Sequence, residues 1–457
     1  MRRKKASQNM LNGPLFSGII LYTVPIILTS VLQLLFNAAD LVIVGRFCGS
    51  VSVAAVGATG ALTNLIINLF VGLSVGAGVT VAHSLGGRQY DAAHRAVHTA
   101  LLTAVISGMT VTVLGVLFSK DLLILMGTPE NVLALSSVYM QIYFSGMVFT
   151  MVYNFCASIL RAAGDTRSPL LYLSIAGVIN VVLNVIFVTV FHMNVAGVAL
   201  ATTISQCFSA VMLVLVLMRR TDACKLVLKD LRIYKTQFLK ILRIGLPAGL
   251  QGSLFSLSNV TIQSSINSFG DVVMSGNAAA ANIEGFLYVS LNAFQQTAVN
   301  YTGQNAGAKQ YDRVKKTLWI CLASATVLGI VAPMLVYAFG PQLLSIYITD
   351  SAQAIAAGLT RLSVVCISYS LCGLMEVATG ALRGMGASVT PMVITILCAC
   401  GVRIGWVYTI FQIPAFHTPQ SLYISYPVSW ALCFTAQMVA FLFIYRRHSR
   451  HYHTPTT

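Results

Sequence analysis

The sequence predicts an all-α polytopic membrane protein. Its twelve transmembrane helices are expected to form two six-helix lobes, related by a pseudo-two-fold axis along the membrane normal. Three observations predict this fold: a composition too apolar for a water-facing surface, twelve long apolar segments, and a repeat of half the chain.

The composition and the apolar segments predict the spans. Of 457 residues, 57% are hydrophobic and 9% are charged, whereas soluble domains carry roughly 25% charged residues. A helix needs about 20 apolar residues to cross a bilayer, and backbone groups facing lipid must be paired within the segment, so such spans are helices. The segments lie near residues 15–40, 52–82, 96–118, 132–159, 169–191, 195–218, 241–266, 272–303, 317–340, 361–382, 389–413 and 422–445.

The basic residues predict the orientation. If the first segment leaves the cytoplasm and every later one crosses, 24 of the 28 Lys and Arg residues face inside, including Arg2–Lys5 and the run Arg219–Arg243. This distribution satisfies the positive-inside rule for a plasma-membrane protein with both termini cytoplasmic. The net charge of +16 therefore does not indicate nucleic acid, whose binding proteins gather basic residues on one face.

An internal repeat divides the chain. Pro25 returns as Pro247, and at nearly the same spacing the loop at 86–91 (GGRQYD) returns at 307–312 (GAKQYD). LRAAG at 160–164 similarly returns as LRGMG at 382–386. We expect an N-terminal lobe at 1–218, a cytoplasmic linker at 219–243 and a C-terminal lobe at 244–457. Parallel repeats of this kind are typical of transporters that work by alternating access, although a duplication that only doubled a scaffold would leave the same pattern.

The repeated loops resemble a known family. LRAAGDTRSP at 160–169, TGQNAGAKQYDRVKK at 302–316 and ALRGMGASVTP at 381–391 resemble the signature loops of multidrug and toxic compound extrusion (MATE) transporters. LFNAADLVIVGR at 35–46 and VAGVALATTISQ at 195–206 do so as well. The resemblance implies a V-shaped pair of six-helix lobes that exports organic molecules by antiport with protons or sodium ions.

Asp40 is the main candidate for cation coupling. Gln33, Asn37 and Asp40 stand at i, i+4 and i+7 and so share one helical face. Charge at membrane depth costs about 2.5–3.5 kcal/mol on insertion scales, so a carboxylate there calls for a role. The resemblance implies that Asp40 couples the cation within the N-terminal lobe; the alternative is an interfacial ion pair with Arg46. Pro25 interrupts the same helix and is a candidate hinge.

The fifth and sixth segments add polar candidates. Asn180 and Asn184 share a helical face near mid-membrane, where they could hold the cation or only bond neighbouring helices. The family often carries aspartate at the second of these positions, so Asn184 departs from it and leaves Asp40 without a second acid. Thr202, with Thr203, matches a polar position of the family near the cavity, and Asn154 is a weaker candidate of the same kind.

The second lobe differs electrically from the first. The position that corresponds to Asp40 in the second repeat is Ile262, so the coupling acid is not duplicated. Glu284 and Glu376 are the remaining acids at membrane depth, and each is a candidate for the cavity or for a structural pair. Arg383 is the possible partner of Glu376, and Arg403 that of Glu284. Sodium-coupled members of the resembled family carry acids in the seventh and tenth helices, and the seventh segment here holds none. The resemblance therefore favours protons over sodium ions as the coupling cation.

Rival functions are less consistent with the sequence. No GxxxxGK[ST] motif is present, and no catalytic constellation indicates an enzyme or a cofactor. Asp91, His94 and His98 share a helical face and could imitate a metal site, but we interpret them as a solvated helix start. A flippase for lipid-linked or other amphipathic molecules is the nearest alternative. We expect a monomer surrounded by membrane lipids that exchanges protons or sodium ions for small organic substrates.

Overall fold

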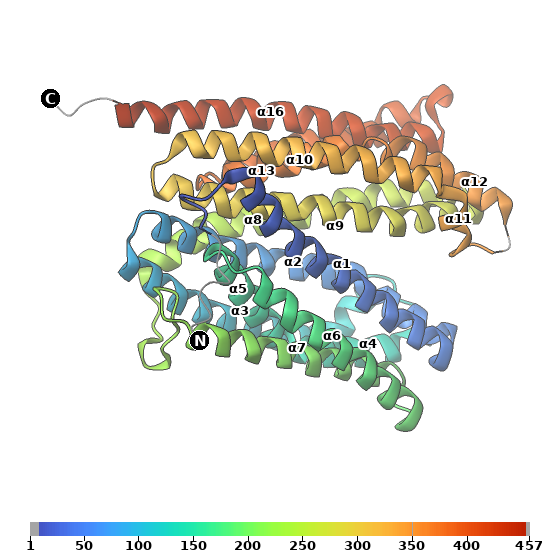
Figure 1. Cartoon of the computed structure of the whole chain (residues 1–457). Helices are drawn as coiled ribbons and strands as arrows, with labels where there is room; N and C mark the ends of the chain where they lie inside the picture. Colours follow the sequence, from blue (N-terminus) through green and yellow to red (C-terminus); the bar gives the residue numbers. More distant parts are fainter. Residues whose placement is uncertain (1–8, 350, 454–457) are drawn as a thin grey trace. The chain divides into compact units, whose positions relative to one another are not determined.

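The computed structural model describes residues 9–349 and 351–453, and within them the chain is helical with no strand. Arg2–Lys5, which are part of the predicted cytoplasmic charge, lie outside the described residues. The first half of the chain forms helices α1 (Leu15–Cys48), α2 (Ser50–Gly86), α3 (Tyr90–Leu125), α4 (Glu130–Ser145), α5 (Met147–Ala162), α6 (Arg167–Val185) with the π-helix η1 (Ile186–Val190), and α7 (Asn194–Met218). Figure 1 shows these elements in sequence colours.

The second half follows the same order. It comprises α8 (Lys235–Asn267), α9 (Asp271–Gly307), α10 (Tyr311–Ala338), α11 (Gly340–Ser345), α12 (Ala352–Arg361) with η3 (Leu362–Cys366), α13 (Tyr369–Gly384), α14 (Val389–Ile394) with η4 (Thr395–Gly401) and α15 (Val402–Tyr408), and α16 (Pro419–His453). Short 3-10 turns lie in the connections as η2 (Leu228–Asp230), η5 (Ile410–Gln412) and η6 (Pro414–Phe416).

Most of the predicted spans are long apolar helices. Among the described residues, eight helices are long and apolar enough to cross a membrane. Two further spans are broken, with α4 and α5 bent by 46° and α12–η3 and α13 bent by 44°. The predicted all-α fold of a polytopic membrane protein is therefore confirmed.

The remaining two of the twelve predicted spans, α8 and α9, are more polar than the others. Their sequences contain repeated Ser, Asn and Gln residues, and several of these side chains are buried, among them Gln251, Asn277 and Gln295. Buried polar groups must find hydrogen-bond partners inside the protein. The first two helices of the second repeat, α8 and α9, thus bury polar side chains in addition to apolar ones.

The backbone repeats as the sequence does. Left-handed conformations occur at Gly49 (φ 86°) and again at its counterpart in the second repeat, Gly270 (φ 88°). They recur in the same way at Gly164 and Gly386 (φ 86° and 83°). Glycine adopts this conformation without a steric penalty, so the matching turns connect corresponding helices in the same way.

The described chain divides into two compact units. Unit 1 contains Asn9 and residues 28–249, and unit 2 contains residues 10–27 and 250–453. Each unit thus includes the first part of the helix that opens the other repeat, because α1 divides after Ile27 and α8 divides after Gly249. Both divisions fall two residues after a proline, Pro25 in α1 and Pro247 in α8. The predicted boundaries at 218 and 244 remain predictions.

Each of these shared segments is packed tightly in its unit. In unit 1, α2 meets α8 through glycines: a Cβ at Gly72 would lie 2.1 Å from the backbone nitrogen of Gly249. Small residues allow membrane helices to approach this closely. In unit 2, α1 meets α9 through Thr23 and Thr297, whose hydroxyls lie 2.8 Å apart.

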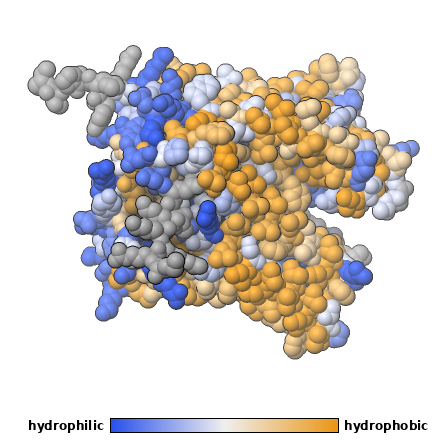
Figure 2. Space-filling model, viewed as in Figure 1, coloured by the Kyte–Doolittle hydropathy of each residue, from blue (hydrophilic) through white to orange (hydrophobic). Residues whose placement is uncertain are grey.

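The surface of the helices agrees with a lipid environment. In Figure 2, hydrophobic side chains cover the flanks of the helices and hydrophilic ones gather toward helix ends. Large apolar side chains are widely exposed, such as Leu117 (67%), Val178 (62%) and Phe443 (70%). Exposed apolar surface on this scale is unfavourable in water and is what hydrocarbon chains contact.

Candidate functional site

Unit 1 contains a polar cluster around Asp40. Asn184 donates a hydrogen bond to Asp40 Oδ1 at 2.5 Å, and Thr202 Oγ1 lies 3.4 Å from Asp40 Oδ2. Asn180 donates to Thr202 at 3.2 Å and accepts from Asn184 at 3.2 Å. The structure therefore brings together four of the predicted site residues, which come from α1, α6 and α7.

Local sequence explains the arrangement. Asn180 and Asn184 lie one turn apart on α6, so their amides point the same way. The helix continues directly into the π-helix η1 at Ile186. π-helical turns frequently occur beside functional sites, and this one begins two positions after the second asparagine.

The cluster is rich in acceptors and holds a carboxylate without a cation. Among the described residues, no Lys, Arg or His forms an ion pair with Asp40; the alternative pairing with Arg46 is therefore not seen. Asn184 Oδ1 is buried with no hydrogen-bond partner within the described part of the chain. A half-buried carboxylate beside an unsatisfied carbonyl oxygen is suited to a proton or to a small cation with oxygen ligands.

Two tyrosines that were not predicted from the sequence also belong here. Tyr139 packs against the apolar cluster that contains Ile43, Val44 and Val198, and its ring stacks on that of Tyr143 with centroids 5.9 Å apart. Their i, i+4 spacing places them on one helical face. That spacing was available in the sequence as a signal.

Other candidates from the first repeat lie apart from this cluster. Gln33 and Asn37 are exposed on α1. Asn154 donates only to the carbonyl of Thr150 in its own helix, at 2.8 Å, among the bonds described for it. Thr203 Oγ1 lies 3.0 Å from the carbonyl oxygen of Ala199 in its own helix and 3.4 Å from that of Ile142 on α4.

In unit 2, Glu284 is paired with an arginine that was not predicted as its partner. Arg361 Nη2 lies 2.7 Å from Glu284 Oε2, and Arg361 Nε lies 3.1 Å from Oε1, so the contact is bidentate. Arg361 also donates to Asn277 at 2.8 Å. The prediction that Arg403 is the partner of Glu284 is wrong, because the Arg403 side chain donates to residues of α8 and α16 instead. The pair is buried, with side chains 8% and 2% exposed.

Glu376 has a neutral partner. Gln295 donates to Glu376 Oε2 at 2.6 Å, and both residues are buried. Arg383, two turns later on α13, donates instead to Gln251 at 2.8 Å. No ion pair between Glu376 and Arg383 occurs in the described residues. Arg383 is also buried rather than exposed at a loop.

The histidines at the start of α3 hold the linker. His98 is fully buried, so the interpretation of this segment as a solvated helix start is wrong for it. Its Nδ1 lies 2.7 Å from the carbonyl of His94, and its Nε2 lies 3.0 Å from the amide of Val227. Asp230, rather than Asp91, completes a group with His94 and His98 whose ligand atoms lie within 4.8 Å of one another. Because both His98 nitrogens have backbone partners, the group anchors the linker on α3.

An ion pair anchors the start of the linker. Arg220 Nη2 lies 2.5 Å from Asp222 Oδ2. Burial opposes ionisation of Asp222, but the hydrogen bonds and charge of Arg220 outweigh it and hold the pKa of Asp222 below its ordinary value.

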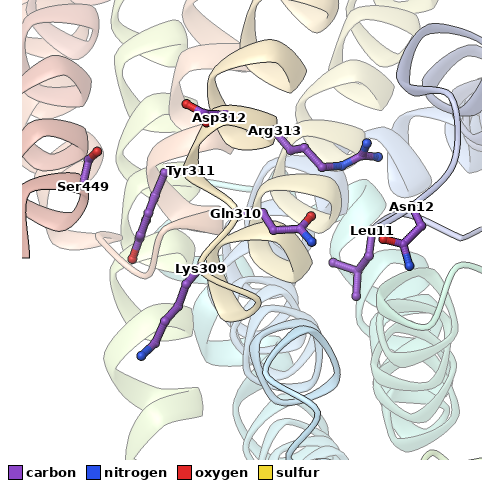
Figure 3. Close-up of a pocket in the computed structure, with 8 residues that line it drawn as sticks. All are labelled: Leu11, Asn12, Lys309, Gln310, Tyr311, Asp312, Arg313 and Ser449. Atoms are coloured by element: carbon purple, nitrogen blue, oxygen red, sulfur yellow. The ribbon is translucent and has the colours of Figure 1, made fainter. Parts of the chain in front are cut away.

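A surface pocket of about 490 Å³ lies at the ends of helices in unit 2. Figure 3 shows its lining, with Arg313 extended toward the segment that precedes α1. Arg313 donates to the carbonyls of Met10 and Gly13, both at 3.0 Å. These hydrogen bonds hold the segment that precedes α1 in place. None of the predicted site residues lines the pocket. Its lining comprises Leu11, Asn12, Lys309, Gln310, Tyr311, Asp312, Arg313 and Ser449.

Comparisons with known proteins cover nearly the whole chain. The family model described as MatE matches residues 25–186 and 247–409. "Probable multidrug resistance protein YoeA" of Bacillus subtilis is 26% identical over 420 residues, 90% of each chain. YpnP of the same organism, also named a probable multidrug resistance protein, is 28% identical over 391 residues, 84% of this chain and 86% of its own.

Solved structures share the fold. A structure described as the outward-facing conformation of a multidrug resistance MATE family transporter superposes with a TM-score of 0.89 at 22% identity. It covers 99% of this chain and 100% of its own. A structure of MATE in the bent conformation gives a TM-score of 0.88 at 22% identity and covers 98% of both chains. The predicted twelve-helix architecture is thereby confirmed.

Proposed function

The chain belongs to the MATE family, and from this premise we propose that it is a proton-coupled antiporter that exports organic, often cationic, compounds by alternating access. Membership of this family makes it a multidrug efflux transporter. We propose the proton as the coupling cation, organic and often cationic compounds as the substrates, and the residues named below as their binding sites.

The observation that carries the proposal is the carboxylate of Asp40, which has no basic partner in the described part of the chain. It is hydrogen-bonded by Asn184 and Thr202, and no basic side chain of the described residues neutralises it. A carboxylate of this kind can take either a proton or a cationic substrate, and the two then compete. Competition for one site couples the two fluxes, because binding of one ligand favours release of the other.

Pro25 supports a route from protonation to movement. It lies inside α1, before Asp40 on the same helix, and the chain passes from unit 2 to unit 1 between residues 27 and 28. Proline removes a backbone hydrogen bond and weakens the helix locally. We therefore assign Pro25 the role of hinge in a helix whose two parts belong to different units.

Protons are preferred to sodium ions on chemical grounds. A sodium site needs several oxygen ligands, and here only one is a carboxylate because position 184 is asparagine. Glu284 is bound by Arg361 and is not free to serve as a second cation ligand.

Transport in membrane vesicles tests the proposal. A cationic dye loaded into vesicles with an imposed pH gradient should be exported, and a sodium gradient of the same size should have no effect. Dye export that requires sodium and ignores a collapsed pH gradient would contradict proton coupling.

We further propose a monomer in the plasma membrane with both termini and the linker cytoplasmic. The distribution of basic residues supports this orientation. A cysteine placed at Lys229 should resist an impermeant thiol reagent added outside intact cells and react after permeabilisation. Labelling from outside would reverse the orientation.

A further inference from the structure

Unit 2 contains a fully buried arginine that no carboxylate of the described residues neutralises. Arg403 has no exposed surface and forms no ion pair with any described residue. Its Nε donates to Ser429 at 3.0 Å and its Nη1 donates to Asn259 at 2.8 Å. Its Nη2 is buried without a partner in the described chain. One arm of the guanidinium fork is therefore available to an acceptor.

Aromatic rings offset part of the buried charge. The guanidinium carbon lies 4.3 Å from the ring centre of Tyr426, 4.9 Å from that of Phe255 and 5.7 Å from that of Trp430. Cation–π contacts stabilise a cation but supply no acceptor for the remaining N–H groups. Glu284 and Glu376, which are buried acids of unit 2, have other partners: Arg361 binds Glu284, and Gln295 donates to Glu376.

The place of Arg403 in the repeat matches that of the Asp40 cluster. Its partners come from α8 and α16, so the site is built from the first, fifth and sixth spans of the second repeat. The Asp40 cluster is built from the same three spans of the first repeat, α1, α6 and α7. Asn259 is the repeat counterpart of Asn37, and Arg403 comes one position after the counterpart of Asn180. The same corner of the repeat thus carries an acid in unit 1 and an arginine in unit 2.

A π-helical turn precedes Arg403 on the same span. The π-helix η4 ends at Gly401, two positions before Arg403, whereas in the first repeat the π-helix η1 begins two positions after Asn184. π-helical turns are frequent at functional sites.

We propose that Arg403, with Asn259 and Ser429, binds the acidic group of transported molecules, a carboxylate being the best match to its planar fork. The inference rests on the proposed export function and narrows its substrate class. Molecules that carry an acidic group beside their basic one should bind and be exported in preference to analogues in which that group is blocked.

A pair of probes tests this. A zwitterionic fluoroquinolone has a free carboxylate, and its methyl ester keeps only the basic amine. Binding of each is measured on the purified protein, and export of each is measured in vesicles. Arg403→Gln should weaken binding of the carboxylate probe about tenfold while the ester binds as to the parent protein. Arg403→Lys should lie between, because it keeps the charge and loses the fork.

A second variant guards against misfolding. Asn259→Asp places a carboxylate beside Arg403 and should reduce binding of the carboxylate probe selectively. Equal losses for both probes in Arg403→Gln and Asn259→Asp would overturn the inference and make Arg403 structural. Chloride-dependent binding of both probes would also overturn it, since chloride would then occupy the site.

The two proposals fail separately. If a pH gradient does not drive export of the ester by the parent protein, the proposed function fails. If the ester is exported and the carboxylate probe is neither bound more tightly nor sensitive to Arg403→Gln, only the present inference fails.

Discussion

The two units differ in how they hold an acidic side chain at membrane depth. In unit 1, Asp40 is a single acid surrounded by asparagine and threonine, and one buried carbonyl oxygen of the cluster has no donor within the described chain. In unit 2, Glu284 forms a bidentate ion pair with Arg361. Gln251 accepts a hydrogen bond from Arg383, and Gln295 donates one to Glu376. An unneutralised acid can exchange ligands, whereas a bidentate buried ion pair holds helices together.

The largest expected effect follows from removing the acid of unit 1. Asp40→Asn keeps the size of the side chain and one acceptor oxygen, but it removes the exchangeable charge. We expect proton-driven export to fall by about tenfold or more, the equivalent of at least ~1.4 kcal/mol of lost coupling. The measurement is dye efflux per molecule of protein in the membrane.

The control is Asp121→Asn, an exposed acid at the end of α3, which should leave export unchanged. Near-normal export by Asp40→Asn would remove Asp40 from the mechanism. The comparison between the two units would then lose its functional meaning.

The second prediction concerns stability in unit 2. Arg361→Gln leaves Glu284 buried without its cation, and breaking a buried pair from one side costs about 3–5 kcal/mol. We expect a lower free energy of unfolding and a lower yield of folded protein in detergent. The double variant Glu284→Gln with Arg361→Gln should recover most of the loss, because neither position of the pair then carries a buried charge.

Arg46→Gln is the matched control, since Arg46 is exposed and forms no ion pair in the described residues. A single variant as stable as the parent protein would contradict a structural role for this pair. It would bring Glu284 back as a candidate for cation binding.

These two sites differ in how far the sequence could predict them. The spans and the repeat follow from composition and from loop spacing, which depend only on the bilayer and on duplication. The cluster around Asp40 could be predicted because helical spacing aligns Asn180 with Asn184 and the family resemblance adds Thr202. Gln33 and Asn37 share the face of Asp40 and are exposed, and their role as cavity residues remains a prediction.

The partner of Glu284 could not be predicted. Arg361 lies far away in sequence on a helix broken at η3, and its direction depends on how that broken span packs. His98 was misread for a similar reason, because the linker that buries it returns much later in the chain, at Val227. Helical periodicity identifies the face that a residue shares, and only tertiary packing identifies what covers that face.

The third prediction is that a second carboxylate in the Asp40 cluster allows sodium ions to drive export. Asn184 Nδ2 lies 2.5 Å from Asp40 Oδ1, so Asn184→Asp supplies a second hard anionic ligand of the kind that alkali and alkaline-earth cations prefer. We expect a sodium gradient alone to drive export about fivefold above background, the equivalent of roughly 1 kcal/mol. Asn154→Asp adds a carboxylate elsewhere at membrane depth and should not create sodium dependence. Absence of any sodium response in Asn184→Asp would mean that ligand count does not decide the ion here.

The smallest effect is expected at Asn180, which touches the acid only through its neighbours. Its amide donates to Thr202 and accepts from Asn184, and both of these residues in turn bond Asp40. Hydrogen bonds between membrane helices average about 0.6 kcal/mol, so Asn180→Ala should reduce export about threefold without abolishing it. Asn154→Ala is the matched asparagine control and should change export by less than about twofold, because its side chain bonds a carbonyl of its own helix. Equal effects of the two substitutions, measured as efflux at matched protein levels, would show that the cluster tolerates loss of its second layer of contacts and that Asp40 needs only Asn184 and Thr202.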